Sequence, residues 1–410
     1  MDSNWAGNVT FTAPDVMAPP TVEAVAAAVA AAESVAVVGT GHAFNRAADG
    51  PVRLTVAALE HDLEVADDGQ KVVVPAGWTY SRLAARLAPH GLALANLAST
   101  PDISIGGAVA SATHGSGRSQ GNLATAVAGL ELVTADGEVR WLRRGDDDFA
   151  GAVVAMGCLG VVTRVELDVE PAYEMRQRFF SDLPWSAVED HLPAVMDLGH
   201  SVSVLTPWDA PTVAWLWVKE RVDAGSGIGA STPFGGVALD RDHDADVLTP
   251  QMGVAGQWHE RLPHFRVGAR PRPGPELQSE WFVAGVRWGE AVAVLRAIGP
   301  TLTPAINVAE IRWVAADDLW LSPQYEQDTV ALHITWHRDR EQDVARAIPL
   351  VHEALAQFDA RVHLAKMTPV TAREMAQRYP RHADFVALAD RLDPHGVFRN
   401  PWSGRVLFDI

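Results

Sequence analysis

The chain has 410 residues, of which 48% are apolar, so it is long enough for two domains with ample hydrophobic cores. Its formal net charge of −18 argues against nucleic acid and anionic membrane surfaces as partners, because both are polyanions. The single cysteine, Cys158, excludes an internal disulfide and favours a cytoplasmic location. Its apolar neighbours predict a buried thiol.

The N-terminal region contains a helix and then a glycine loop. The alanine-rich run of residues 22–32 includes Glu23 and predicts a surface helix, not a signal peptide or membrane span. A short apolar strand then leads into Gly39-Thr40-Gly41-His42. Glycines there let the main chain turn tightly and present N–H groups to an anionic ligand. The nicotinamide-type dinucleotide fingerprint is not met, because Phe44 occupies the place of its third glycine.

Short valine-rich strands alternate with alanine-rich helical stretches as far as residue 170, which indicates an α+β fold. Residues 72–80 predict a strand and a helix start, with Thr79 or Ser81 as the cap of a helix reaching Leu87. Asp136-Gly137 predicts the tight turn of a hairpin. Residues 100–117 form a second stretch rich in glycine, alanine and serine. Their small side chains allow a bulky group to pack directly against the backbone.

Beyond Pro171 the composition shifts to tryptophan-rich strands, with a Gly, Ser and Asp loop at 223–246. We therefore expect a second domain over 173–367, after a first domain over 1–172, and a final segment, 368–410, that returns to the first domain.

No metal site is expected. The acids of 240–246 lack the glycine and glutamate of an EF-hand, and 259–264 has the wrong spacing for a zinc helix.

Two short stretches carry polar pairs two residues apart. Glu310 and Arg312 form one pair, and His333 and Thr335 form the other. In strands, both members of a pair project from the same face. Either pair alone could belong to an ordinary amphipathic sheet with a solvated face. Lys366, one of only three lysines in the chain, lies among apolar neighbours and favours a chemical role for the group.

The two glycine-rich loops resemble those by which the vanillyl-alcohol-oxidase-type flavoproteins hold FAD, and residues 152–163 resemble the segment against the adenosine. The motifs around Glu310, His333 and Lys366 are similar to those of the sugar-alcohol and aldonolactone oxidase branch, most closely the alditol oxidases. The resemblance implies an α+β flavoprotein with an FAD-binding domain of the vanillyl-alcohol-oxidase (PCMH) type and a cap domain on an antiparallel sheet. It also implies FAD attached covalently through His42. The implied cofactor contacts are Val38, Gly39, Thr40, Gly41, His42, Ala43, Ser99, Ser104, Gly107, Ala108, Val109, Ala110, His114, Gly157, Val162 and His363.

The resemblance further implies a polyol site over the flavin. Its substrate-binding residues would be Ser99, Glu310, Arg312, Thr335 and Lys366. The implied catalytic residues are Lys366, Arg312, His333 and Glu310. A small residue at Ala98 would leave room for O2 near the flavin. If residues 362–367 form one strand, His363 and Lys366 point to opposite faces, so the strand bulges or one of the two assignments is wrong.

The implied reaction converts the C1 hydroxyl of a polyol such as xylitol or sorbitol to the aldose and reduces O2 to hydrogen peroxide. His333 and Lys366 are both candidates for the base, and the residues leave that choice open. The alternatives are an aldono-1,4-lactone oxidase or dehydrogenase, another sugar- or nucleoside-type alcohol oxidase of the same family, or a flavin-binding protein without turnover. We expect a monomer.

Overall fold

The structure is a computed structural model that describes residues 1–222, 232–269 and 276–409. The helices are α1 Val22–Ala30, α2 Tyr80–Leu87, α3 Ile105–Ala110, α4 Phe149–Val153, α5 Trp185–Glu189, α6 Leu192–Met196, α7 Trp288–Leu302, α8 Glu341–Ala356, α9 Ala372–Arg378, α10 His382–Leu392 and α11 Pro401–Ser403. The strands are β1 Ala36–Val37, β2 Arg53–Leu54, β3 Glu64–Val65, β4 Lys71–Pro75, β5 Leu92–Ala93, β6 Val127–Val133, β7 Val139–Arg143, β8 Val161–Asp168, β9 Glu170–Pro171, β10 Glu174–Leu183, β11 Ser201–Thr206, β12 Val213–Arg221, β13 Val237–Ala238, β14 Gly256–Gln257, β15 Glu276–Ala284, β16 Ile306–Val314, β17 Thr329–His337 and β18 Arg361–Val362.

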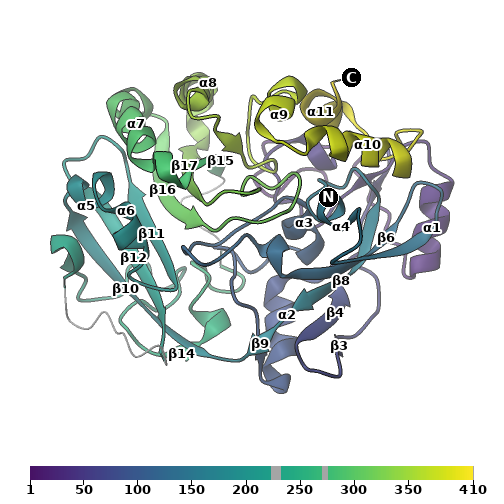
Figure 1. The fold of residues 1–410 in the computed structure, drawn as a ribbon, viewed down its shortest axis with the longest axis horizontal. Helices are drawn as coiled ribbons and strands as arrows, with labels where there is room; N and C mark the ends of the chain where they lie inside the picture. The colour runs from purple at the N-terminus through teal and green to yellow at the C-terminus, as the bar shows by residue number, and fades with distance from the viewer. Residues whose placement is uncertain (223–231, 270–275, 410) are drawn as a thin grey trace.

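The N-terminal part contains a five-stranded antiparallel sheet in the order β3-β4-β8-β6-β7 (Figure 1). The predicted helix at its start is α1, which turns Val25 and Val29 into the core. Thr79 caps α2 by accepting a hydrogen bond from the Arg82 amide, as expected. The predicted hairpin joins β6 to β7, and Gly137 adopts a φ of +80° in the turn, which glycine tolerates without a steric penalty.

The middle of the chain builds a nine-stranded sheet, with β14 pairing β10 at one side of the path β13-β10-β12-β11-β16-β17-β15-β18. Glu310 lies directly opposite His333 in the β16–β17 pair, and His333 lies opposite Glu280 in the β17–β15 pair. The alternate residues, such as Ile311 and Leu332, are fully buried. Helices α7 and α8 pack on β15, and α8 also packs on β17, on the left of the molecule in Figure 1.

The C-terminal helices α9 to α11 lie above the N-terminal part (Figure 1). The Val35 amide donates to the Val397 carbonyl, and the Asn400 side chain donates to the Ala47 and Asp49 carbonyls. The final segment therefore contacts the first part of the chain. The exact domain boundaries stay a prediction.

Three further expectations concern local features. Cys158 is buried, and burial raises the pKa of its thiol to about 12, so the predicted buried thiol is confirmed. Residues 223–231 of the expected loop lie outside the described residues, whereas 237–238 form the short strand β13. In the part of the chain that the structure describes, no helix is long and apolar enough to cross a membrane.

Candidate active site

The two glycine-rich loops meet. The Ser104 amide, just before α3, donates a hydrogen bond of 3.1 Å to Thr40 Oγ1 in the first loop. A Cβ atom on Gly39 would collide with Ser104 Oγ, and one on Gly107 would lie 2.9 Å from the same oxygen. Glycine at 39 therefore lets the first loop approach Ser104 of the second, whereas the contact of Gly107 lies within the second stretch.

The backbone amides of this junction are free for a ligand. Among residues 1–222, 232–269 and 276–409, none accepts a hydrogen bond from the N–H groups of 39–43 or of Gly107. The loop is partly exposed, so these donors line an accessible surface. A run of unpaired N–H groups suits an anion such as a pyrophosphate. The unpaired amides of this junction therefore fit the pyrophosphate of FAD.

His42 lies at the end of that loop. Its Nδ1 atom is 3.0 Å from Thr40 Oγ1, and its ring stacks on Trp5 with centroids 5.3 Å apart. Burial lowers the pKa of His42 to about 4, so the imidazole is neutral at neutral pH and its nitrogen can act as a nucleophile. Nothing in the sequence indicated Trp5, whose amide donates to the Gly41 carbonyl.

The other expected cofactor residues take several positions. Ala108, Val109 and Ala110 lie on α3, and Gly157 turns with a φ of +76° beside Val37. Val162 is half-buried on β8, opposite Leu132 of β6. Ala98 is buried just before Ser99. Their role in holding the cofactor stays a prediction.

Glu310, Arg312 and Ser99 form a buried hydrogen-bonded group. The Arg312 guanidinium donates to Glu310 Oε2 and, over 2.8 Å, to Ser99 Oγ, so it links the nine-stranded sheet to the N-terminal part. Burial works to raise the pKa of Glu310, but Arg312, together with smaller effects of His264 and His333, outweighs it and holds this pKa well below its usual range. Glu310 Oε1 and Arg312 Nε remain without hydrogen-bond partners among the described residues. These two atoms can serve a ligand.

His333, Thr335 and Lys366 form a second group next to the first. Lys366 Nζ lies 2.6 Å from His333 Nδ1 and 2.7 Å from Glu280 Oε2, and His333 Nε2 lies 3.0 Å from Thr335 Oγ1. Burial and the neighbouring Lys366 lower the pKa of His333 to about 4. Burial also lowers the pKa of Lys366, while Glu280 opposes that change. Both faces of the sheet are buried at β16 and β17, so the solvated-sheet alternative is wrong.

The relation of His363 to Lys366 is also resolved. β18 ends at Val362, and the Lys366 amide donates to the His363 carbonyl over 3.0 Å. Residues 363–366 therefore turn instead of continuing a strand, so strand parity does not separate them. His363 is buried, with its ring centroid 6.0 Å from that of His114.

Sequence reasoning missed two residues of this site. Glu280 is completely buried beside Lys366, and its signal was the alternation of Glu276, Gln278 and Glu280 along one strand. His264 lies in an irregular segment and had no comparable signal. Its amide donates to the Ser99 carbonyl over 2.9 Å, and its Nε2 lies 3.8 Å from Glu310 Oε1.

One group of described residues, His114, Glu280 and His363, has the geometry to hold a metal ion, although the sequence predicts none. The Lys366 amine lies 2.7 Å from the same carboxylate. Burying a second cation beside an ammonium group is costly. The contacts of Glu280 therefore favour a hydrogen-bonded cluster without metal.

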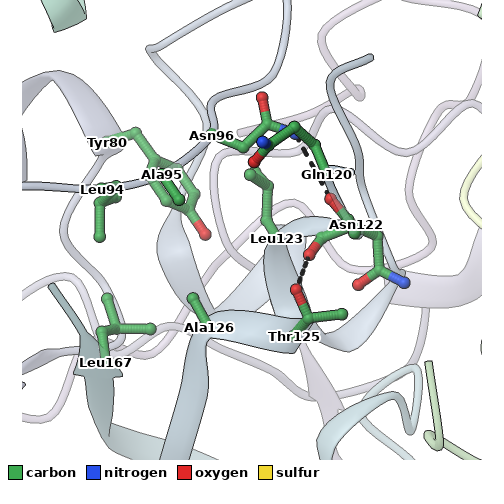
Figure 2. A pocket seen from close by; sticks show the side chains of 11 residues that line it. Tyr80, Leu94, Ala95, Asn96, Gln120, Asn122, Leu123, Thr125, Ala126 and Leu167 are labelled. Atoms are coloured by element: carbon green, nitrogen blue, oxygen red, sulfur yellow. Dashed lines mark hydrogen bonds between the residues drawn. The ribbon is translucent and has the colours of Figure 1, made fainter. Parts of the chain in front are cut away.

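A separate cavity of about 50 Å³ lies in the N-terminal part (Figure 2). Tyr80, Asn96 and Asn122 are among its lining residues, and none of the expected site residues lines it. The Tyr80 hydroxyl is buried without a partner among the described residues. The cavity is large enough for a water molecule, which would satisfy this hydroxyl.

Comparisons with known proteins agree with this arrangement. Residues 14–143 match the family described as FAD binding domain, and residues 288–406 match the D-arabinono-1,4-lactone oxidase family. The chain is 42% identical to alditol oxidase from Streptomyces sp. over 97% of both chains. It is 30% identical to L-gulono-1,4-lactone dehydrogenase from Mycobacterium tuberculosis over 99% of this chain and 98% of that protein.

The crystal structure of cholesterol oxidase from B. sterolicum superposes with a TM-score of 0.80, covering 99% of this chain and 96% of that chain. At 15% identity, this likeness concerns the fold alone and supports the predicted α+β architecture with its antiparallel sheets. Family membership rests instead on the sequence matches, through the share of each chain that they cover and their percentage identity. The chain belongs to the family of FAD-dependent oxidoreductases that includes alditol oxidase and L-gulono-1,4-lactone dehydrogenase.

Proposed function

We propose that the protein is an FAD-dependent alditol oxidase that converts the C1 hydroxyl of an acyclic polyol, such as xylitol or sorbitol, to the aldose, with O2 reduced to hydrogen peroxide. The similarity to alditol oxidase over nearly the whole chain supports this assignment. One structural observation carries it. Glu310 Oε1 and Arg312 Nε are buried and have no hydrogen-bond partners among the described residues, within a cluster of further polar groups.

The chemistry of these groups supports a substrate with many hydroxyls. Each buried polar group left unsatisfied costs roughly 1 to 3 kcal/mol. A hydroxyl can donate to Glu310 Oε1 and accept from Arg312 Nε, whereas an apolar alcohol offers one such group only. A chain with a hydroxyl on nearly every carbon therefore matches the cluster better.

Each residue of the cluster has a distinct task in the proposal. Bound FAD would supply the hydride acceptor for the C1 hydrogen and pass the electrons to O2. Glu310, Arg312 and Ser99 bind and orient the hydroxyls. Lys366 and His333 hold the proton that leaves the C1 hydroxyl. The permanent charge of Arg312 stabilises negative charge that develops beside it.

The cofactor proposal also has finer parts. The free amides of the loop at 39–43 would hold the pyrophosphate, and His42 would be bonded to the 8α-methyl of the flavin. The small side chain of Ala98 would leave space for O2 to reach the flavin. We further propose that the protein works as a monomer, and that it works in the cytoplasm, a location that its single cysteine supports.

An aldono-1,4-lactone oxidase or dehydrogenase is the second candidate. The match of residues 288–406 to the D-arabinono-1,4-lactone oxidase family favours it, because this range includes Glu310, His333 and Lys366. A flavin-binding protein without turnover would not require these polar side chains to be gathered in one buried cluster.

A substrate panel tests the assignment. Peroxide release is measured with xylitol, sorbitol, glycerol, an aldono-1,4-lactone and a nucleoside. We expect the highest kcat/KM for xylitol or sorbitol. A higher value for the lactone or the nucleoside than for both long polyols would refute the polyol assignment. Absence of flavin reduction by all five compounds under anaerobic conditions would support the carrier alternative.

A further inference from the structure

Glu280 occupies a central place in the polar face of the nine-stranded sheet. It lies on β15 directly opposite His333 of β17, and His333 lies opposite Glu310 of β16. Its side chain is completely buried. A carboxylate in such a position is stable only when opposite charges and hydrogen bonds surround it.

Both carboxylate oxygens of Glu280 face cationic or ionisable groups. Oε2 lies 2.7 Å from Lys366 Nζ and 3.7 Å from His333 Nδ1, while Oε1 lies 3.2 Å from His114 Nε2. Burial works to raise the pKa of Glu280, but Lys366 and His114 outweigh it and hold this pKa well below its usual range. Glu280 is therefore an anion at neutral pH.

The contacts also assign the protons of its neighbours. When Lys366 is an ammonium group, it donates to Glu280 Oε2 and to His333 Nδ1, which lies 2.6 Å away. The proton of neutral His333 is then on Nε2 and is donated to Thr335 Oγ1, 3.0 Å away. In this state one positive charge on the Lys366–His333 couple faces one negative charge on Glu280.

Uptake of a substrate proton adds a second positive charge to the couple. The O–H bond of the substrate breaks as an N–H bond forms at Lys366 Nζ, and a different Nζ–H bond breaks as one forms at His333 Nδ1. In the proposed oxidation the C1 hydrogen leaves with its electron pair to the oxidised cofactor. The hydroxyl proton is then on Lys366, and His333, which has received a proton from Lys366, is an imidazolium next to the Glu280 carboxylate.

We propose that Glu280 is a positioning residue, the counter-ion that allows the Lys366–His333 couple to accept the hydroxyl proton of the substrate. The inference rests on the proposed alcohol oxidation. Two other charged or titratable groups near Glu280 cannot take over its role as the anion. Arg312 is a permanent cation, and burial keeps the pKa of His363 well below its usual range. Glu280 is the anion in direct contact with Lys366, and its charge works to raise the pKa of both Lys366 and His333, whereas Glu310 acts on Lys366 as a smaller, more distant contribution.

The test uses the holoenzyme with Glu280→Gln, which removes the charge and keeps the shape. Glu276→Gln is the matched control. Glu276 is a half-buried carboxylate at the start of the same strand, β15, and accepts a hydrogen bond from Gln278; its effect on Lys366 is through space, without a hydrogen bond. Retention of FAD colour and of the binding constant for xylitol shows that a variant is folded.

The first readout is the pH dependence of anaerobic flavin reduction. In Glu280→Gln we expect the maximal rate to fall by at least about a hundredfold, the scale of general-base catalysis. Loss of the anion lowers the pKa of the couple, so the acidic limb of the profile moves down by at least about one pH unit. Glu276→Gln keeps the wild-type profile. An unchanged profile in Glu280→Gln would overturn the proposal, even if the rate falls.

The second readout does not require turnover. In ¹⁵N-histidine-labelled protein at pH 7, with His333→Gln used to assign the signals, we expect His333 to carry its proton on Nε2 in the wild type and in Glu276→Gln. In Glu280→Gln, where Lys366 is no longer held as ammonium, the proton shifts wholly or partly to Nδ1. The same tautomer in all proteins would contradict the inference, whereas failure of every substrate in the panel would contradict only the proposed function.

Glu280→Asp provides a second variant if the glutamine variant loses FAD. It keeps the negative charge but withdraws it by one methylene group. We expect it to retain the Nε2 tautomer and to lose less activity than Glu280→Gln. A His333 proton on Nδ1 in Glu280→Asp would count against the counter-ion role.

Discussion

The neutral imidazole of His42 lies at the end of the loop whose amides are free for the cofactor. We predict a covalent bond from this imidazole to the flavin. After acid precipitation, the yellow colour should stay with the wild-type protein, and it should appear in the supernatant when His42→Ala is treated in the same way. His382→Ala is the control, because this histidine lies far along the chain and hydrogen-bonds the Leu407 carbonyl. Release of all the flavin from the wild type would exclude the bond.

Two cations of the cluster should each be needed for flavin reduction. We predict that Lys366→Ala and Arg312→Ala each lower the reduction rate by at least about a hundredfold, the usual result of removing a preorganised charge. Rapid mixing with xylitol under anaerobic conditions measures the rate. Lys71→Ala, a partly exposed lysine of β4, should keep the wild-type value. A near-normal rate in either site variant removes that residue from the mechanism.

The segment between β16 and β17 is attached to the N-terminal part by a buried polar network. Asn122 Nδ2 donates to Asp317 Oδ2 over 2.7 Å, to Ser322 Oγ and to Gln324 Oε1. Ser322 Oγ also donates to Asp317 Oδ2 over 2.6 Å. This network connects the two strands that carry the site residues to the cofactor-binding part.

Asp317 makes the stability of this network depend on pH. Burial raises the pKa of Asp317 from 3.8 to about 6, so the folded protein binds a proton more tightly than the unfolded chain. The resulting stabilisation is complete below about pH 4 and is lost as the pH rises through about 6, amounting to at most roughly 3 kcal/mol.

Asp317→Asn removes that titration, so we predict that the wild type loses Tm relative to this variant between pH 4 and pH 7. Thermal unfolding at a series of pH values measures the difference. Asp318→Asn, a change of the exposed neighbouring residue, should give a curve parallel to that of the wild type. If the curve of Tm against pH for Asp317→Asn were also parallel to that of the wild type, the proton affinity of the Asp317 carboxyl would not change on folding.

At the level of the whole molecule, the site lies between the nine-stranded sheet and the N-terminal part (Figure 1). Helices pack on one face of that sheet. The opposite face bears Glu280, Glu310 and His333 and is closed by Ser99 and His114 from the N-terminal part. One chain therefore supplies both the free amides for the cofactor and the polar cluster for the substrate, in agreement with the proposed monomer.

Several local features of the fold and of the site could be predicted from the sequence alone. The cap at Thr79 and the hairpin turn at Gly137 follow from local backbone preferences. Period-two alternation placed Glu310 with Arg312, and His333 with Thr335, because successive side chains of a strand point to opposite faces. These features depend on neighbours within a few residues, so the sequence determines them before any tertiary contact forms.

Other features were decided only by tertiary structure. The register of β15, β17 and β16 places Glu280, His333 and Glu310 in one row, and a shift of one residue would turn each side chain to the other face. The turn at 363–366 brings Lys366 to Glu280, and the irregular segment before Phe265 brings His264 to Ser99. Residues so far apart in the chain meet through the packing of the whole sheet against the N-terminal part. That packing cannot be predicted from local sequence, because the free energy that stabilises it comes from contacts between segments far apart in the chain.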